Sequence, residues 1–136
     1  MTAGRTSGRA ELALADTSVF IALEQERRLS GSPPEAVAVS VITVGELRLG
    51  VLAASDGPTR ARRLETLSRA EGLEPLPIDT AVAHAWAALR LALRDGGKRM
   101  PLNDSWIAAT AIANRIPVVS QDDDYDEVPG LQVIRV

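Results

Sequence analysis

The sequence has no cysteine, one histidine and few aromatic residues. The lack of cysteine excludes disulfides, thiolate chemistry and cysteine-based zinc sites. A single histidine argues against a histidine-rich metal site and against a Ser-His-Asp triad. Any catalytic site must therefore use carboxylates and hydroxyls. Because only 3% of the residues are aromatic, the core must be built from Leu, Val, Ile and Ala.

Long hydrophobic runs are also missing. No apolar stretch reaches membrane-spanning length, and residues 1–11 lack the hydrophobic centre of a signal peptide. We therefore expect a cytoplasmic protein with no membrane partner. The 136 residues, 46% of them apolar, are enough for one domain with a substantial core. We assign residues 12–136 to that domain and expect residues 1–11, rich in Gly, Ser, Thr and Arg, to be a flexible leader.

The net charge of -3 does not indicate nucleic-acid binding, but a net charge conceals local distribution. All but one of the 15 basic residues are arginine, the side chain best suited to forked contacts with phosphate. One predicted helix is strongly basic, with Arg60, Arg62, Arg63 and Arg69. This face is either simply solvated or a surface for a phosphate backbone, and the sequence leaves both readings open.

Apolar runs alternate with helical patterns along the chain. Buried strands are predicted at 12–15, 36–39, 116–119 and 131–136, and an edge or irregular strand at 73–78, where two prolines fall. Helices are predicted between them, including one over 40–54. Regular alternation of strand and helix indicates an α/β fold with a mainly parallel sheet.

Acidic residues stand at the ends of these elements. Asp16 follows the first strand and Asp122 a late one, at the sheet edge where open α/β proteins bind ligands. Asp104 begins a helix whose apolar face is Ile107, Ala108, Ala111 and Ile112. Each acid also has an ordinary interpretation, because Asp and Asn are favoured helix caps, and both Asn103 and Asp104 occupy capping positions.

Glu46 lies early in the helix after the second strand. Thr43 and Glu46 have the spacing of a capping box, which is the structural interpretation. If Thr43 is instead inside the helix, Glu46 shares an inward face with Ile42 and Leu49. A carboxylate there is costly unless it is paired.

If the strand ends converge, these acids share one pocket. Two like charges 4 Å apart repel by about 4 kcal/mol at an effective dielectric of about 20, so the cluster needs protons or a cation. Oxygen ligands suit Mg²⁺ or Mn²⁺. Such an ion polarises a phosphoryl oxygen and activates water, which makes phosphodiester hydrolysis the natural reaction class.

Four segments carry a family resemblance, in this order: Ala15-Asp16-Thr17-Ser18, Thr43-Val44-Gly45-Glu46-Leu47, Asn103-Asp104-Ser105-Trp106-Ile107-Ala108-Ala109-Thr110-Ala111 and Val119-Ser120-Gln121-Asp122-Asp123-Asp124-Tyr125. Together they resemble the PIN-domain ribonucleases, and most of all the VapC toxins of bacterial VapBC toxin–antitoxin pairs. The resemblance covers residues 12–136. It implies a three-layer α/β/α fold and an endoribonuclease that depends on Mg²⁺ or Mn²⁺.

The resemblance also implies roles for individual residues. The family's catalytic acids fall on Asp16, Glu46, Asp104 and Asp122, and the expected metal ligands are Asp16, Asp104 and Asp122. Thr17, Ser120 and Asp124 are expected in auxiliary or substrate-contacting positions. Ser120 stands where the family usually has Thr, and Tyr125 where Phe is common.

The implied partners are an RNA substrate, a VapB-type antitoxin and a second copy of the chain. An acidic pocket attracts cations, so we expect an antitoxin arginine to enter it. We place the dimer interface on the helices at 42–54 and 58–70, which carry Leu47, Val51, Leu64 and Leu67.

Two other functions remain as alternatives. A phosphoreceiver-like signalling domain is also a small α/β protein with clustered acids, but it needs a Lys at a late strand end. The sole Lys here, Lys98, is in a predicted loop. A non-catalytic PIN-like binding module is the second alternative. Metal-dependent RNA cleavage would distinguish both from a nuclease.

Overall fold

The computed structural model describes residues 12–32, 34 and 36–136, so the predicted leader at 1–11 lies outside the described residues. The four strands form one parallel sheet in the order β2-β1-β3-β4. The strands are β1 (Leu12–Ala15), β2 (Ala36–Ala38), β3 (Val118–Ser120) and β4 (Val133–Arg135). The helices are α2 (Thr17–Glu24), α3 (Val41–Ala53), α4 (Gly57–Glu71), α5 (Thr80–Asp95) and α6 (Leu102–Asn114).

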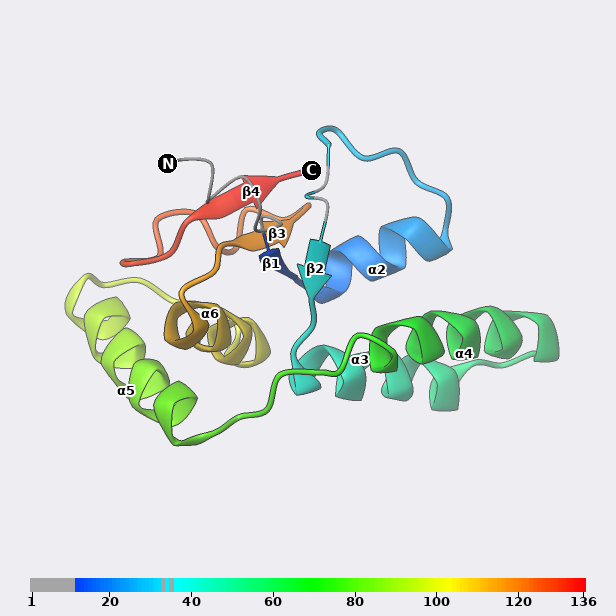
Figure 1. Ribbon diagram of the computed structural model, residues 1–136, viewed down its shortest axis with the longest axis horizontal. Coiled ribbons are helices and arrows are strands. Elements are labelled where there is room, and N and C mark those ends of the chain that lie inside the picture. The colour runs from blue at the N-terminus through cyan, green and yellow to red at the C-terminus, as the bar shows by residue number, and fades with distance from the viewer. Residues whose placement is uncertain (1–11, 33, 35) are drawn as a thin grey trace, which may run out of the picture.

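Helices cover both faces of the sheet (Figure 1). Ala13 and Ala15 of β1 pack with α2, α3 and α4, whereas Leu14 between them packs with α5 and α6. This alternation is the period-two pattern of a strand buried on both sides. The predicted three-layer α/β/α fold with a parallel sheet is therefore confirmed, and the described sheet is parallel throughout.

The prediction of a strand at 73–78 is wrong. Only Leu76 makes a bridge, to Ser40 just beyond β2, and there its N–H donates to the Val39 carbonyl at 2.8 Å and its carbonyl accepts from Val41 N at 3.1 Å. Pro75 and Pro77 on either side have no N–H to continue a ladder. The segment therefore touches the sheet at one residue and leads on to α5.

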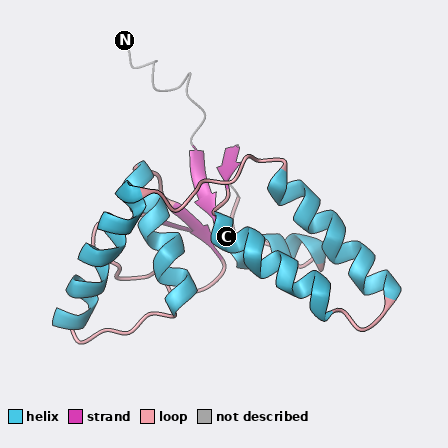
Figure 2. Cartoon of the chain, turned by 90° about the horizontal axis from the view of Figure 1, so that it is seen from below, coloured by secondary structure: helices cyan, strands magenta, loops and turns pink. Residues whose placement is uncertain are grey.

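The leucines and valine chosen for a dimer interface lie mostly inside the molecule. Helices α3 and α4 form an antiparallel hairpin (Figure 2), and Leu47, Val51 and Leu67 are buried in its contact with the sheet. Of the four proposed residues only Leu64 is exposed. The interface prediction at these residues is wrong, because the apolar pattern that we assigned to a partner serves the protein's own core.

Two arginines of α4 form hydrogen bonds that hold this hairpin together. Arg60 Nη2 donates to the Ala54 carbonyl and Arg63 Nη1 to the Gly50 carbonyl, each at 2.8 Å. These carbonyls lie at the C-terminal end of α3, where helix carbonyls lack intrahelical partners. Two of the four basic residues of α4 thus fasten the hairpin rather than face a ligand.

Among the residues that the structure describes, none of the helices combines the length and apolar character that crossing a bilayer requires.

Candidate active site

The predicted site residues meet at the carboxyl edge of the sheet. Asp16 directly follows β1, and its N–H donates to the Val119 carbonyl of the neighbouring β3 at 3.0 Å. Asp104 lies in the first turn of α6, and Asp122 follows the end of β3. Because β1 and β3 are adjacent and parallel, the turns after both strands open on the same edge.

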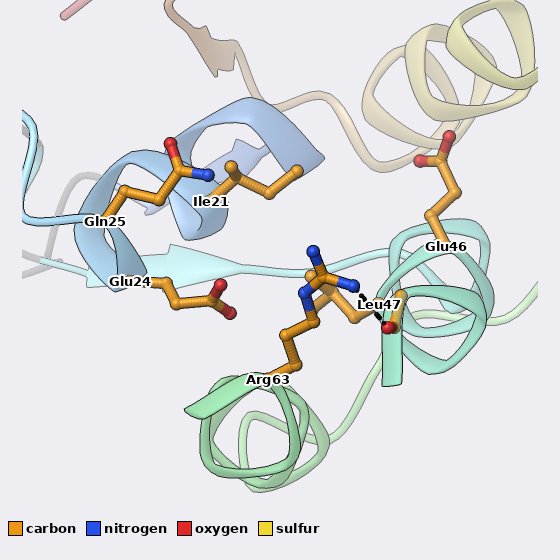
Figure 3. Close-up of a pocket in the computed structure, with 7 residues that line it drawn as sticks. Ile21, Glu24, Gln25, Glu46, Leu47 and Arg63 are labelled. Atoms are coloured by element: carbon orange, nitrogen blue, oxygen red, sulfur yellow. Dashed lines mark hydrogen bonds between the residues drawn. The ribbon is translucent and has the colours of Figure 1, made fainter. Parts of the chain in front are cut away.

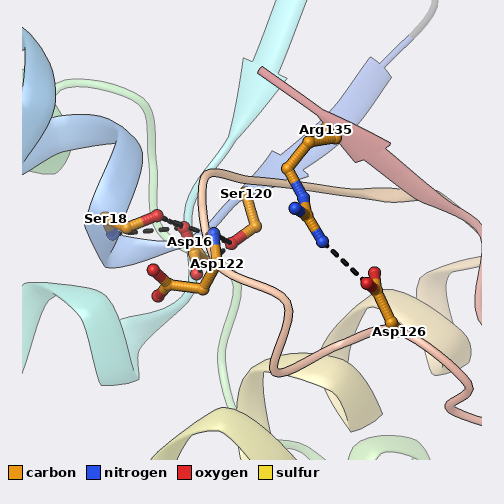
Figure 4. Close-up of polar contacts among 6 residues, drawn as sticks. All are labelled: Asp16, Ser18, Ser120, Asp122, Asp126 and Arg135. Carbon is orange, nitrogen blue, oxygen red and sulfur yellow. Dashed lines mark hydrogen bonds and ion pairs between the residues drawn. The ribbon is translucent and has the colours of Figure 1, made fainter. Parts of the chain in front are cut away.

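Asp16 is held by two serine hydroxyls (Figure 4). Its Oδ1 accepts from Ser18 N at 3.1 Å and from Ser18 Oγ at 2.6 Å, and its Oδ2 accepts from Ser120 Oγ at 2.9 Å. The side chain is 3% exposed. Asp16 thus does cap α2, as the ordinary interpretation holds, but its second oxygen is committed to β3 instead of the helix.

The same two serines fix the turn that carries Asp122. Ser18 Oγ accepts from Gln121 N at 3.1 Å, and Ser120 Oγ accepts from Asp122 N at 2.9 Å. Each hydroxyl gives its one proton to Asp16 and receives a backbone N–H from the turn. Burial raises the pKa of Asp16 above its ordinary value, the serine hydrogen bonds oppose this rise, and the charge of Asp122 adds to it.

Asp104 is not a helix cap, so the capping interpretation of Asn103 and Asp104 is wrong. The N-cap of α6 is Pro101, and no side chain makes a capping hydrogen bond there. Burial, a side-chain hydrogen bond with Asp124 and the charges of Asp124 and Asp16 raise the pKa of Asp104 to about 7. The buried phenol of Tyr125 donates to Asp104 Oδ1 at 3.3 Å, which partly opposes that rise.

Glu46 lies between two helix N-termini. Its Oε1 accepts from Thr17 Oγ1 at 2.5 Å and its Oε2 from Asn103 Nδ2 at 3.3 Å. Thr17 gives its proton to Glu46, so it accepts from Thr43 Oγ1, 3.0 Å away. Glu46 therefore connects the starts of α2 and α6 and is a paired carboxylate.

The capping-box interpretation of Glu46 is wrong as well. Ser40 caps α3, and Thr43 is fully buried inside the helix. The inward face that we predicted is correct only in part, because Glu46 is half-buried while Leu49 is 66% exposed.

Sequence reasoning gave no role to Ser18 and only a capping role to Asn103, although both belong to the segments that carry the family resemblance. Ser18 stands two residues after the buried acid, the position from which a hydroxyl and its own N–H reach back to an Asp carboxylate. Asn103 directly precedes Asp104 and points to Glu46. Both were recognisable as hydrogen-bond donors next to acids.

A small pocket of about 220 Å³ adjoins Glu46 (Figure 3). Its walls come from α2, α3 and α4, with Ile21 and Leu47 as apolar contacts and Arg63 opposite Glu24 and Gln25. This pocket lies beside the acids and has both apolar and charged walls.

The donor set fits a hard divalent cation in its chemistry. All candidate ligands are oxygens, and Asp16 Oδ2 accepts a single hydrogen bond, which leaves it a lone pair for an ion. Burial raises the pKa values of Asp16 and Asp104, and the charges of neighbouring acids add to this rise; a cation would offset that repulsion. Across the described part of the chain, however, no three acidic or imidazole side chains stand close enough together to make a ready-made metal site.

Comparison with known proteins agrees with this arrangement. The family model described as PIN domain matches residues 13–131. The chain is 51% identical to ribonuclease VapC4 of Mycobacterium tuberculosis over 91% of this chain and 96% of that one, and 46% identical to ribonuclease VapC5 of the same organism over 89% and 93%. The crystal structure of VapBC-5 from M. tuberculosis superimposes with a TM-score of 0.83, at 42% identity, over 93% of this chain and 99% of that one.

These matches span nearly the whole of both partners. The chain belongs to the PIN-domain family and, within it, to the VapC proteins.

Removing the charge of Asp104 should change how stability depends on pH. Its pKa in the folded protein is about 7 against 3.8 ordinarily, so folding favours the protonated acid. This contribution is present at low pH and disappears as the pH rises through about 4 to 7. Metal-free wild type should therefore lose free energy of unfolding between about pH 5 and pH 8. Asp104→Asn should lose less free energy of unfolding over this range, and it should be more stable than wild type at about pH 8.

Urea unfolding in EDTA measures this difference. Glu65→Gln is the matched control, because it makes the same acid-to-amide change on the exposed face of α4. An identical pH dependence of the free energy of unfolding in wild type and Asp104→Asn would show that folding does not disfavour the ionised form of Asp104.

Proposed function

We propose that this protein is an endoribonuclease toxin that hydrolyses RNA phosphodiester bonds with the help of Mg²⁺ or Mn²⁺. The observation that supports this most is the convergence of acids from separate segments, with Asp16, Asp104 and Asp124 close enough to raise the pKa of Asp104. The similar proteins from M. tuberculosis are named as ribonucleases. RNA as substrate also agrees with the expected cytoplasmic location.

In this proposal Asp16, Asp104 and Asp122 hold the metal. When bound, the ion supplies an activated water and stabilises the negative charge that develops on the phosphate. The protein's own residues position these ligands. Ser120 and Ser18 favour the ionised form of Asp16 by donating to both oxygens, and they hold the turn of Asp122 beside it.

The remaining candidates act around these ligands. Asp124 lies beside Asp104, where its charge adds to the effect of burial in raising the pKa of Asp104, and a bound cation would favour the ionised form of Asp104. Thr17 and Asn103 orient Glu46 from two sides, so that Glu46 either contacts the ion or acts through water. Tyr125, kept as a neutral phenol by burial that raises its pKa, fixes the direction of Asp104.

The alternative functions have less support. A phosphoreceiver needs a Lys at its acids, but Lys98 lies in the loop between α5 and α6 and is paired with Glu127 at 2.8 Å. Membership of the PIN family also argues against this alternative. A non-catalytic binding module loses acids that it does not use, whereas all four are present in this chain.

Asp16→Asn and Asp104→Asn should each reduce RNA cleavage by at least about 100-fold, because each removes a charged ligand while keeping the size of the side chain. Chelation of divalent ions by EDTA should abolish cleavage by wild type, and added Mg²⁺ or Mn²⁺ should restore it. The measurement is the initial rate on labelled RNA, followed by mapping of the 5′ ends that brief induction creates.

Asp123→Asn is the matched control, since Asp123 is an exposed acid in the same turn whose side chain makes none of the contacts described above. Its rate should stay near that of wild type. Cleavage by purified Asp104→Asn within a few-fold of wild type would exclude the assignment of this acid.

We also infer a cognate antitoxin that blocks the acids. The solved VapBC structures similar to this chain are toxin–antitoxin complexes. An arginine of the antitoxin would pair with carboxylates in place of the metal, because a charge-assisted fork is a strong contact. The pocket beside Glu46 would receive the neighbouring antitoxin residues, since it joins Ile21 and Leu47 to the acidic Glu24.

A stoichiometric antitoxin should therefore suppress RNA cleavage by wild type. Asp104→Asn should bind the antitoxin more weakly, because one negative charge facing the arginine is lost. Calorimetry measures the affinity, and Asp123→Asn again serves as the control. Full cleavage in the presence of excess antitoxin would contradict the inferred inhibition.

The homodimer is the last part of the proposal. Leu49 and Leu52 are 66% and 65% exposed and stand three residues apart on α3, on one side of the helix. A monomer leaves this apolar surface in water. Wild type should scatter light as a dimer at micromolar concentration, and Leu49→Glu/Leu52→Glu as a monomer. Replacement of Leu91, an exposed leucine on α5, by Glu should leave the dimer intact.

A further inference from the structure

We infer that the basic pocket at the C-terminal end of α5 binds phosphates of the RNA strand next to the bond that is cleaved. This inference rests on the proposed nuclease function and extends it to the way the substrate is held. We call the surface the α5 basic pocket. It is lined by Arg90, Arg94, Gly97, Lys98, Arg99 and Met100, and its volume is about 590 Å³.

Among the described residues, two of the four cations in this pocket have no acidic partner. In the described chain, the ion pairs within this pocket are Arg94 with Asp95 at 3.5 Å and Lys98 with Glu127 at 2.8 Å. Arg90 and Arg99 are exposed and form no ion pair there. Guanidinium groups without a partner are the side chains best suited to forked contacts with phosphate oxygens.

The pocket is connected to Asp104 by two separate sets of contacts. On one side, Arg90 lies 5.7 Å above the ring of Trp86, whose Nε1 donates to Ser105 Oγ at 3.0 Å, and Ser105 is the next residue after Asp104. Trp86 also stacks on Trp106, with ring centroids 4.3 Å apart. These contacts place Arg90 close to the start of α6.

On the other side, Lys98 reaches Glu127 in the same turn as Tyr125, which donates to Asp104. Arg99 precedes Asp104 by five residues, so their Cα atoms are at most about 18 Å apart. A strand with one phosphate at Asp104 would therefore have its next few phosphates within reach of the pocket.

The charges of two neighbouring segments explain why a phosphate-binding pocket would lie beside the acids. Residues 122–127 contain five acids, which repel a polyanion even when one metal ion is bound. Residues 90–99 contain four cations and one acid, and they lie directly beside that acidic turn. Attraction to flanking phosphates would offset the repulsion, and such contacts dominate the affinity of proteins for nucleic acids.

The other basic helix is a weaker candidate. Helix α4 lies at the opposite end of the molecule from α5 (Figure 1). There Arg60 and Arg63 bind carbonyls of α3, and Arg69 is paired with Glu65 at 2.8 Å. Its exposed residues Arg62 and Arg69 therefore provide a control with the same charge change.

The test compares Arg90→Gln/Arg99→Gln with Arg62→Gln/Arg69→Gln. Binding is measured in an Asp104→Asn background, with a fluorescein-labelled single-stranded RNA of about 20 nucleotides. Loss of two phosphate contacts should weaken binding about tenfold or more and flatten the dependence of log affinity on log salt by about 1.4. The control pair should bind like its parent.

Cleavage and fluorescence complete the test. With Asp104 intact, Arg90→Gln/Arg99→Gln should raise KM and leave kcat unchanged, since neither arginine touches the acids. Both tryptophans of the chain belong to the stack under Arg90, so RNA binding should change their emission in the parent and in the control pair. Both pairs should melt like wild type, because all four side chains are exposed or partnered only at the surface.

The outcomes separate the two claims. If wild type does not cleave RNA with Mg²⁺ or Mn²⁺, the proposed function fails. If it cleaves, and Arg90→Gln/Arg99→Gln matches the control pair in affinity and salt dependence, this inference alone fails. If Arg90→Gln/Arg99→Gln keeps its RNA affinity but no longer binds the antitoxin, the pocket is a protein-docking surface and the inference is overturned.

Discussion

The arrangement of the site depends on one buried carboxylate. Asp16 is almost without solvent, so its charge must be met by hydrogen bonds from the protein, and these come from Ser18 and Ser120. Ser120 can reach Asp16 only because β3 lies beside β1 in the sheet. The same hydroxyls accept the backbone N–H groups that fix the next turn. Burial of one acid therefore determines where the second acid, Asp122, is held.

Much of this arrangement could be predicted from the sequence, because each strand ends where its apolar run ends. Asp16 and Asp122 follow such runs, which places them at one edge of any parallel sheet. The interactions across that edge were not predictable, because periodicity and spacing show which face of a helix or strand is apolar but not which element packs against it. Leu47 and Leu67 looked like an unpartnered surface, whereas the α3–α4 hairpin and the sheet bury both. Likewise, nothing local in the sequence indicates that Asp104 has Asp124 as a hydrogen-bonding neighbour.

Capping and catalysis are not competing interpretations of an acid at a helix start. Asp16 caps α2 with Oδ1 and still keeps Oδ2 available at the site. Asp104 has the sequence position of a cap but makes no capping contact, so its carboxyl is left to Asp124 and Tyr125. An acid that faces other acids, and does not pair with a free backbone N–H of its helix, has a perturbed pKa without a capping role, and this is the stronger indication of function.

Net charge gives little information about such a protein because opposite charges are separated along the chain. The acidic turn at 122–127 gathers the oxygens that suit a cation, and the stretch at 90–99 gathers guanidinium groups. The ion pair of Lys98 with Glu127 joins the two segments directly. Under the proposed function an RNA strand would need both, because its scissile phosphate would be met by a cation held by the acids while its flanking phosphates are repelled by those acids. The boundary between the two charged segments is therefore where the proposal places the RNA strand.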